Sequence, residues 1–195
     1  MLLSRDDGYL GVLVDDLVTK GVDEPYRMMT SRAEYRLVLR QDNADFRLTE
    51  RGYNAGLATR ERYERMLRRR EELERARALL KERRLDVPLR KPDASFAQIA
   101  AQAPEVSVET GRQLEIEIKY EGYIERQMAD VRRFRRLESM PLPGDADYLH
   151  MDGLRLEARE KLDRQRPASL GQASRIPGVS PGDVTVLTIW LEKRR

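Results

Sequence analysis

Residues 60–84 read RERYERMLRRREELERARALLKERR, a run of strong helix formers that contains neither proline nor glycine. Thr59 directly precedes the run and has the hydroxyl group that caps a helix. The apolar residues recur at helical spacing and form one narrow stripe: Tyr63, Met66, Leu67, Leu73, Ala76 and Leu80. With 11 basic and 6 acidic residues, the polar face is either solvated or in contact with RNA. The sequence predicts one long helix here.

Most of the chain after this run also predicts helices. A short helix is expected to begin after Asp93 or Ser95, and a longer one to cover 108–136 with a break or kink near Gly122. The proline-rich stretch 140–144 is typical of a linker. Shorter helices are predicted at 156–164 and 170–175, the latter capped by Ser169, and a last one follows the cap Ser180. The fold class is therefore mainly α.

Sequence upstream of the long run is harder to interpret. Residues 8–18 read GYLGVLVDDLV and predict a short apolar strand or buried turn. Residues 35–40 are compatible with a strand or with a helix. Thr49 is a candidate cap for a short helix at 50–56. This segment is expected to mix helix with extended structure.

Composition excludes several classes of chemistry. Cysteine is absent and His150 is the only histidine, so thiolate nucleophiles, zinc–cysteine sites and a His-based triad within the chain are excluded. No dinucleotide-binding or P-loop motif occurs. Asp15 and Asp16 are favoured as turn or cap residues over a metal pair. Apolar runs are too short for a membrane span and the N-terminus is unlike a secretion signal, so we expect a cytoplasmic chain without membrane contact.

Arginine and tyrosine are concentrated in residues 25–40, PYRMMTSRAEYRLVLR. Guanidinium groups pair with phosphates and phenol rings stack on bases, so this density indicates an RNA-binding segment. A second arginine-rich face is predicted around Arg126, Arg132 and Arg133. The stretch 175–181, RIPGVSP, is either a simple turn or a phosphate-binding hairpin of the helix-hairpin-helix kind.

Three blocks resemble the MnmG/GidA family of tRNA uridine 5-carboxymethylaminomethyl modification enzymes. They are GVLVDDLVTKGVDEPYRMMTSRAEYRLVLRQDNADFRLTE at 11–50, EIEIKYEGYIERQ at 115–127 and GLRLEAREKLDRQRPASLGQASRIPGVSPGDV at 153–184. Arg155 stands where the family usually has a helix-capping serine, at an expected cost of about 1 kcal/mol. The family's FAD-binding and NADH-binding segments would lie upstream of this chain. The resemblance thus implies a C-terminal fragment, inactive alone, of an FAD-dependent homodimeric flavoprotein.

The resemblance implies three parts: the C-terminal edge of a flavin domain as a short α/β remnant (1–45), a helical domain (46–143) and a small helical end subdomain (144–195). It implies that these parts dock tRNA, for modification at carbon 5 of the wobble uridine, and an MnmE-type GTPase partner. We expect no cofactor to bind this chain alone. A stand-alone helical nucleic-acid-binding or protein-interaction module is the alternative.

The candidate site residues follow from these regions. The candidate tRNA-binding residues are Arg27, Arg32, Arg36, Arg40, Lys119, Tyr120, Tyr123, Arg126, Gln127, Arg132 and Arg133. The candidate partner-docking residues are Gly171, Gln172, Arg175 and Gly178. No catalytic, cofactor-binding or metal-binding residue is predicted.

Overall fold

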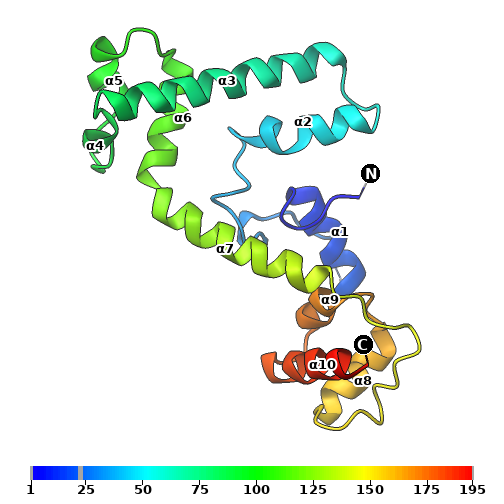
Figure 1. Ribbon diagram of the computed structural model, residues 1–195. Helices are drawn as coiled ribbons and strands as arrows, with labels where there is room; N and C mark the ends of the chain where they lie inside the picture. The colour runs from blue at the N-terminus through cyan, green and yellow to red at the C-terminus, as the bar shows by residue number, and fades with distance from the viewer. Residues whose placement is uncertain (1, 22–23, 195) are drawn as a thin grey trace. The chain divides into compact units, whose positions relative to one another are not determined.

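The computed structural model describes residues 2–21 and 24–194 (Figure 1). Helices are the regular elements of these two ranges, and no strand occurs in them. An isolated antiparallel bridge joins Pro141 to Ser169. The mainly α fold is therefore confirmed, whereas the predicted α/β remnant at the start of the chain is wrong.

Helix α1, Tyr9–Thr19, replaces the strand or turn predicted at 8–18. Its buried residues include Val12, Asp16 and Thr19, which are four and three positions apart. This spacing places them on one face of a helix, whereas a strand would need alternation. The spacing of apolar residues did not reveal this helical face, because two of its three buried residues are polar.

The chain divides into two compact units, which are described separately. Unit 1 holds residues 2–3 and 35–127, and unit 2 holds residues 4–34 and 128–194 as far as the structure describes them. Helix α7, Glu121–Glu138, gives its first residues to unit 1 and the rest to unit 2.

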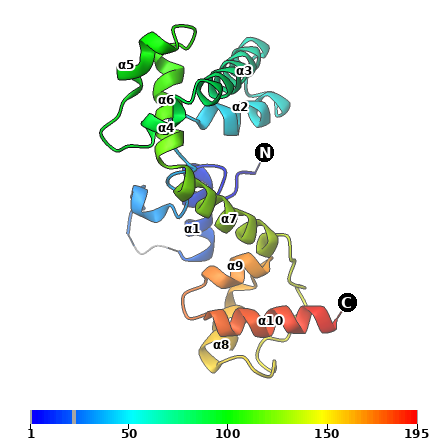
Figure 2. The same cartoon turned by 60° about the vertical axis from the view of Figure 1, so that its left-hand side comes forward.

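Unit 1 is built on the long helix that residues 60–84 predict. This helix, α3, spans Arg60–Glu82, and the Thr59 hydroxyl accepts a hydrogen bond from the Arg62 N–H, as expected of its cap. Helix α2 lies alongside α3 (Figures 1 and 2). The other elements of unit 1 are α2, Ala44–Asn54; α4, Asp86–Leu89; α5, Phe96–Ile99; the 3-10 turn η2, Ala100–Gln102; and α6, Val108–Lys119.

The apolar core of unit 1 lies where α3 meets α5 and α6. Leu80, Leu89, Phe96 and Leu114 are fully buried in it. Gly111 of α6 packs directly on the Phe96 ring, so that a methyl group at this position would overlap the ring. The close approach of α5 to α6 therefore depends on this glycine.

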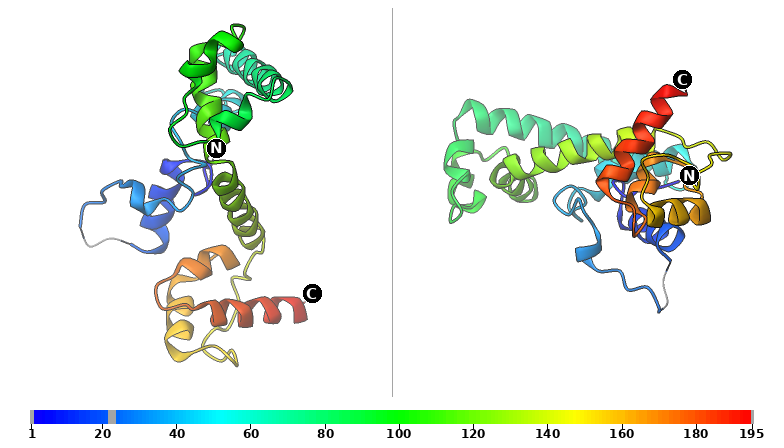
Figure 3. Two further views of the ribbon diagram at one scale, coloured as in Figure 1. Left: turned by 90° about the vertical axis from the view of Figure 1, so that its left-hand side faces the viewer. Right: turned by 90° about the horizontal axis from the view of Figure 1, so that it is seen from below.

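Unit 2 combines α1 with the C-terminal helices (Figure 3). Its other elements are η1, Thr30–Arg32; α8, Leu156–Gln165; α9, Leu170–Arg175; and α10, Pro181–Lys193. The predicted caps Ser169 and Ser180 are both confirmed, and Ser180 forms a capping box with Asp183. Tyr148, Leu162, Leu170 and Leu187 are core residues.

Two local predictions need correction, and a third is confirmed. Thr49 lies inside α2 and is buried, because that helix begins at Ala44, six residues earlier than expected. Residues 35–40 form turns instead of a strand or helix, with the N–H groups of Val38 and Leu39 donating to the Tyr35 carbonyl. The predicted break near Gly122 is confirmed: α6 ends at Lys119 with Tyr120 as its C-cap, and α7 begins at Glu121.

Candidate nucleic-acid interface

Arg5 lies at the centre of a buried ionic network in unit 2. Its Nη1 donates to Asp16 Oδ1 at 2.7 Å and to Asp15 Oδ2 at 2.9 Å, and its Nη2 donates to Glu34 Oε1 at 2.6 Å. The side chains of Arg5 and Asp16 are each only 2% exposed. Burial acts to lower the pKa of Arg5, but the hydrogen bonds to Glu34 and Asp16 outweigh it and raise the pKa. Arg5 thus remains charged and ties α1 to the segment before Tyr35.

Asp16 connects this network to the arginine- and tyrosine-rich segment. It accepts hydrogen bonds from the Tyr26 hydroxyl at 2.7 Å and from Lys20 Nζ at 2.9 Å. Burial acts to raise the pKa of Asp16, but the donors Lys20, Tyr26 and Arg5 prevail and lower it to about 2. The Arg32 guanidinium lies 4.5 Å from the centre of the Tyr26 ring, a cation–π contact. Asp16 is therefore an ionised anchor for Tyr26.

The four predicted arginines of this segment differ in their surroundings. Arg27 and Arg36 are exposed, and no ion pair links either to a described residue. Arg32 is partly exposed beside Tyr26, 4.0 Å from Asp16 Oδ2. Arg40, in unit 1, is 14% exposed; it donates to Asp42 at 2.9 Å and to the Leu37 carbonyl at 2.8 Å. Arg27 and Arg36 are the guanidinium groups most open to a phosphate.

The predicted patch at the α6–α7 junction also divides into open and engaged residues. Tyr120 and Tyr123 are exposed, with ring centres 6.4 Å apart, and the Arg126 guanidinium lies 5.7 Å from the Tyr123 ring centre. By contrast, Lys119 Nζ donates to Glu115 at 2.8 Å and to the Ala94 carbonyl at 2.5 Å. The aromatic pair and Arg126 form an open stacking surface.

The remaining members of the predicted RNA set lie further along the same helix or against the 35–40 turns. The side-chain oxygen of Gln127 accepts a hydrogen bond from the Leu37 N–H at 3.0 Å, so it supports the backbone there. Arg132 and Arg133 of α7 are exposed and form no ion pair with described residues.

The predicted partner-docking residues are mainly engaged within unit 2. Arg175 donates from Nη1 to Glu138 at 2.5 Å, and its guanidinium lies 5.2 Å from the centre of the Phe134 ring. Burial acts to lower the pKa of Arg175, but hydrogen bonds to Asp15 and Glu138 raise it. Gln172 accepts a hydrogen bond from the Ala168 N–H at 2.8 Å. These contacts hold α9 in place within unit 2.

Two glycines of this set occupy positions that a larger residue would disturb. A Cβ atom at Gly171 would overlap the Glu138 carboxylate. Gly178 has a φ of +100° and lies against Glu157, so it needs both the left-handed backbone and the missing side chain. Both glycines allow close approach between chain segments of unit 2.

Arg155 shows how unit 2 compensates for a missing helix cap. Its side chain makes no capping bond to α8. Instead, Nη2 donates to Asp183 Oδ2 at 2.8 Å and to the Gly178 carbonyl at 2.8 Å. Burial acts to raise the pKa of Asp183, but hydrogen bonds from Arg155 and Ser180 lower it. Arg155 therefore joins the start of α8 to the start of α10.

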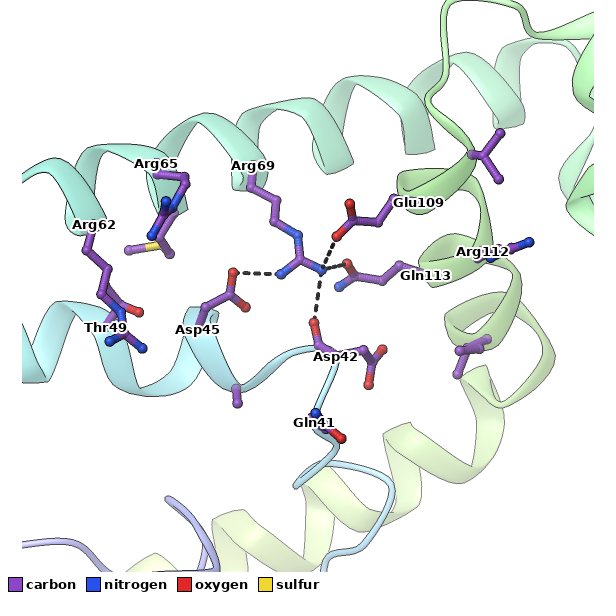
Figure 4. A pocket seen from close by; sticks show the side chains of 14 residues that line it. Gln41, Asp42, Asp45, Thr49, Arg62, Arg65, Arg69, Glu109, Arg112 and Gln113 are labelled. Carbon is purple, nitrogen blue, oxygen red and sulfur yellow. Dashed lines mark hydrogen bonds and ion pairs between the residues drawn. The ribbon is translucent and has the colours of Figure 1, made fainter.

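Unit 1 contains a cleft of about 1240 Å³ that the sequence did not lead us to predict (Figure 4). We call it the α3–α6 cleft, and its arginines are Arg62, Arg65, Arg69 and Arg112. Arg69 donates to Asp45 Oδ2 and Gln113 Oε1, each at 2.7 Å, and to the Asp42 carbonyl at 3.0 Å. The spacing of the three α3 arginines was a usable signal, because positions 62, 65 and 69 share a helix face.

Within residues 2–21 and 24–194, no group of three or more His, Asp or Glu side chains could hold a metal ion. Within the same ranges, no helix combines the length and hydropathy required to cross a bilayer.

Comparison with known proteins supports the resemblance. Residues 60–128 match a family model described as the tRNA modifying enzyme MnmG/GidA C-terminal helical domain. Residues 130–195 match a second, the MnmG/GidA C-terminal helical bundle. Similar relatives include the tRNA uridine 5-carboxymethylaminomethyl modification enzymes MnmG of Caldicellulosiruptor saccharolyticus and Alkaliphilus oremlandii. They are 45% and 47% identical over the whole of this chain.

The chain spans 36% and 35% of those two relatives' lengths. Among solved structures, it is similar to Aquifex aeolicus GidA in crystal form II. The TM-score is 0.81 at 35% identity, over 98% of this chain and 34% of that one. The match to the form I crystal has the same TM-score at 38% identity. From its helical architecture and these matches, the chain belongs to the MnmG/GidA family and corresponds to that family's C-terminal helical region.

Proposed function

We propose that this chain is the tRNA- and partner-docking region of an FAD-dependent enzyme that modifies carbon 5 of the wobble uridine. In this proposal FAD and NADH serve the parent enzyme, which is a homodimer, and the chain alone is inactive. The observation that carries the proposal is the combination of open and anchored residues in segment 25–36. Arg27 and Arg36 are open to a phosphate, while Tyr26 is held by the buried carboxylate of Asp16.

The aromatic pair on the α6–α7 junction adds a second kind of RNA contact. Tyr123 is 60% exposed and lies beside Arg126, which suits stacking with an unpaired base. An anticodon loop offers such bases, whereas a duplex does not. We assign Tyr120, Tyr123 and Arg126 to base contacts and Arg27, Arg36, Arg132 and Arg133 to phosphate contacts.

Docking of an MnmE-type GTPase is assigned to unit 2. Leu156 at the start of α8 is 71% exposed and Ile189 of α10 is 48% exposed. Exposed apolar side chains of this size suit a protein interface. Substitution Leu156→Glu is expected to weaken association with the purified GTPase at least tenfold. The matched control is Leu57→Glu, because Leu57 is 74% exposed but belongs to unit 1. Equal association of both variants would contradict this assignment.

Binding of a tRNA transcript across a salt series tests the RNA assignment. Each lost phosphate contact lowers the slope of log K against log salt by roughly 0.7–0.9, so Arg27→Gln with Arg36→Gln should lower it by about 1.5. Arg164, an exposed arginine of α8, provides the control substitution. If the double variant had the same salt slope as the original chain, the proposal for segment 25–36 would be wrong.

A further inference from the structure

We propose that the α3–α6 cleft is a second binding surface for RNA phosphates, formed by Arg62, Arg65 and Arg112. It rests on the proposed function, since it extends RNA docking to a face of unit 1 outside the predicted set. The cleft is open and about 1240 Å³ in volume. Arg62 and Arg65 belong to α3 and Arg112 to α6, so the three arginines come from two helices that line the cleft.

The carboxylates that line the cleft are already engaged by other arginines. Asp45 is bound by Arg69 at 2.7 Å, and the Asp42 carboxylate is bound by Arg40 at 2.9 Å. Glu109 lies 3.8 Å from Arg69 and is 81% exposed. Arg69 is thereby fixed in place, as its dashed contacts in Figure 4 show. The acidic residues of the cleft therefore pair with Arg40 and Arg69, and none of them forms an ion pair with Arg62, Arg65 or Arg112.

Arg62, Arg65 and Arg112 are exposed, and no ion pair links them to the described residues. Other arginines of α3 do have partners: Arg60 pairs with Glu64 at 2.8 Å, and Arg77 pairs with Glu117. A cleft with an excess of positive charge attracts an anionic ligand. Guanidinium groups bind phosphate oxygens in a bidentate manner, which makes phosphate the fitting chemistry.

The lining favours a nucleic acid over a protein partner. Protein interfaces are built around buried apolar anchors. Here Met66 is only 2% exposed, and Val108 is the one large, exposed apolar side chain among the described residues that line the cleft. A backbone of successive phosphates can instead contact arginines on both walls. An acidic protein surface is the competing occupant.

The test uses the 195-residue chain and a tRNA transcript as the probe. The variant carries Arg62→Gln, Arg65→Gln and Arg112→Gln. We expect the salt slope to fall by about 2–3, with at least about tenfold weaker binding at 0.1 M salt. The control carries Arg68→Gln, Arg75→Gln and Lys81→Gln. These three residues are exposed on α3, have no described ion-pair partner and lie outside the cleft. The control should bind with nearly the original slope.

Each outcome decides between the two proposals. If the cleft variant keeps the original slope while Arg27→Gln with Arg36→Gln lowers it, the cleft proposal is overturned and the proposed function stands; an acidic protein then becomes the occupant to test. If the cleft variant and the control lose tRNA affinity and salt slope equally, the effect is one of net charge and the cleft is not a binding site. If only the cleft variant loses binding, the cleft is confirmed and the assignment of segment 25–36 fails. If the chain binds no tRNA, both proposals fail.

Discussion

Arg175 donates two parallel hydrogen bonds to Asp15, from Nε at 2.8 Å and from Nη2 at 2.7 Å, although the two residues are 160 positions apart. Asp15 also binds Arg5 at 2.9 Å. One carboxylate thus joins the N-terminal helix α1 to helix α9 inside unit 2. The packing of α9 and the anchoring of the arginine- and tyrosine-rich segment 25–40 therefore both depend on Asp15 and its neighbour Asp16.

Substitution Arg175→Gln is expected to destabilise unit 2 by about 3 kcal/mol, because it removes the charged partner of the partly buried Glu138 and one of the two charged partners of Asp15. Urea unfolding monitored by circular dichroism would measure the change. Arg164→Gln removes an exposed arginine of α8 and should change the free energy of unfolding by less than about 0.5 kcal/mol. Equal stability of the two variants would show that the Arg175 network contributes nothing net.

Stability should depend on pH through Asp16. Its pKa is about 2 in the folded chain against a usual value of 3.8, so the native state holds this carboxylate in its charged form. The associated stability is fully present above about pH 4 and is lost as the pH falls toward 2, amounting to about 2 kcal/mol. Urea unfolding of the original chain and of Asp16→Asn between pH 2 and 6 would check this. Their difference in stability should shrink at the acid end; a constant difference would contradict the assignment.

Replacing two helical glycines, Gly171 and Gly122, by alanine should change stability in opposite directions. Gly171→Ala places a methyl group against the Glu138 carboxylate and should destabilise the chain by about 1–3 kcal/mol. Gly122→Ala meets nothing within 4 Å in α7 and should stabilise it by up to about 1 kcal/mol. Thermal unfolding measures both. If Gly171→Ala unfolded at a higher temperature than Gly122→Ala, the close approach at Glu138 would be disproved.

Tyr123 should contribute to RNA affinity through its ring. Tyr123→Ala is expected to weaken tRNA binding by about 1–3 kcal/mol, the usual value of one base–aromatic stack. Tyr123→Phe keeps the ring and should bind nearly as well, which separates stacking from loss of the hydroxyl. Because Tyr123 is exposed, neither change should affect the unfolding temperature. Equal binding by the alanine and phenylalanine variants would exclude a stacking role.

Local sequence signals predicted the elements that depend on neighbouring residues. Thr59, Ser169 and Ser180 each cap the helix that follows them. A cap needs only a hydroxyl and N–H groups two or three residues away, so it can be predicted from neighbouring residues in the sequence. Helix α1 was missed because its inward face includes the charged Asp16, which only a buried partner can neutralise.

The predicted RNA-binding residues were also only partly correct, because contacts between distant residues decide which of them are open. Exposure of Arg27 and Arg36 agrees with what their sequence density suggests, but the contacts of Arg40 and Lys119 within unit 1 could not be foreseen. The α3–α6 cleft was also missed, because its walls come from segments more than forty residues apart, as the Arg69–Gln113 contact shows.

By itself, the sequence determined the helical class, the helix caps and the family, since each depends on residue types at short spacing. Only the tertiary structure decided which charges are free and which are neutralised. Arg5, Asp15 and Arg175 look like ordinary surface residues in the sequence, yet they form one network around the buried Arg5. The physical reason is that an ion pair depends on separations of a few ångströms in space, which residue order does not encode across 160 positions.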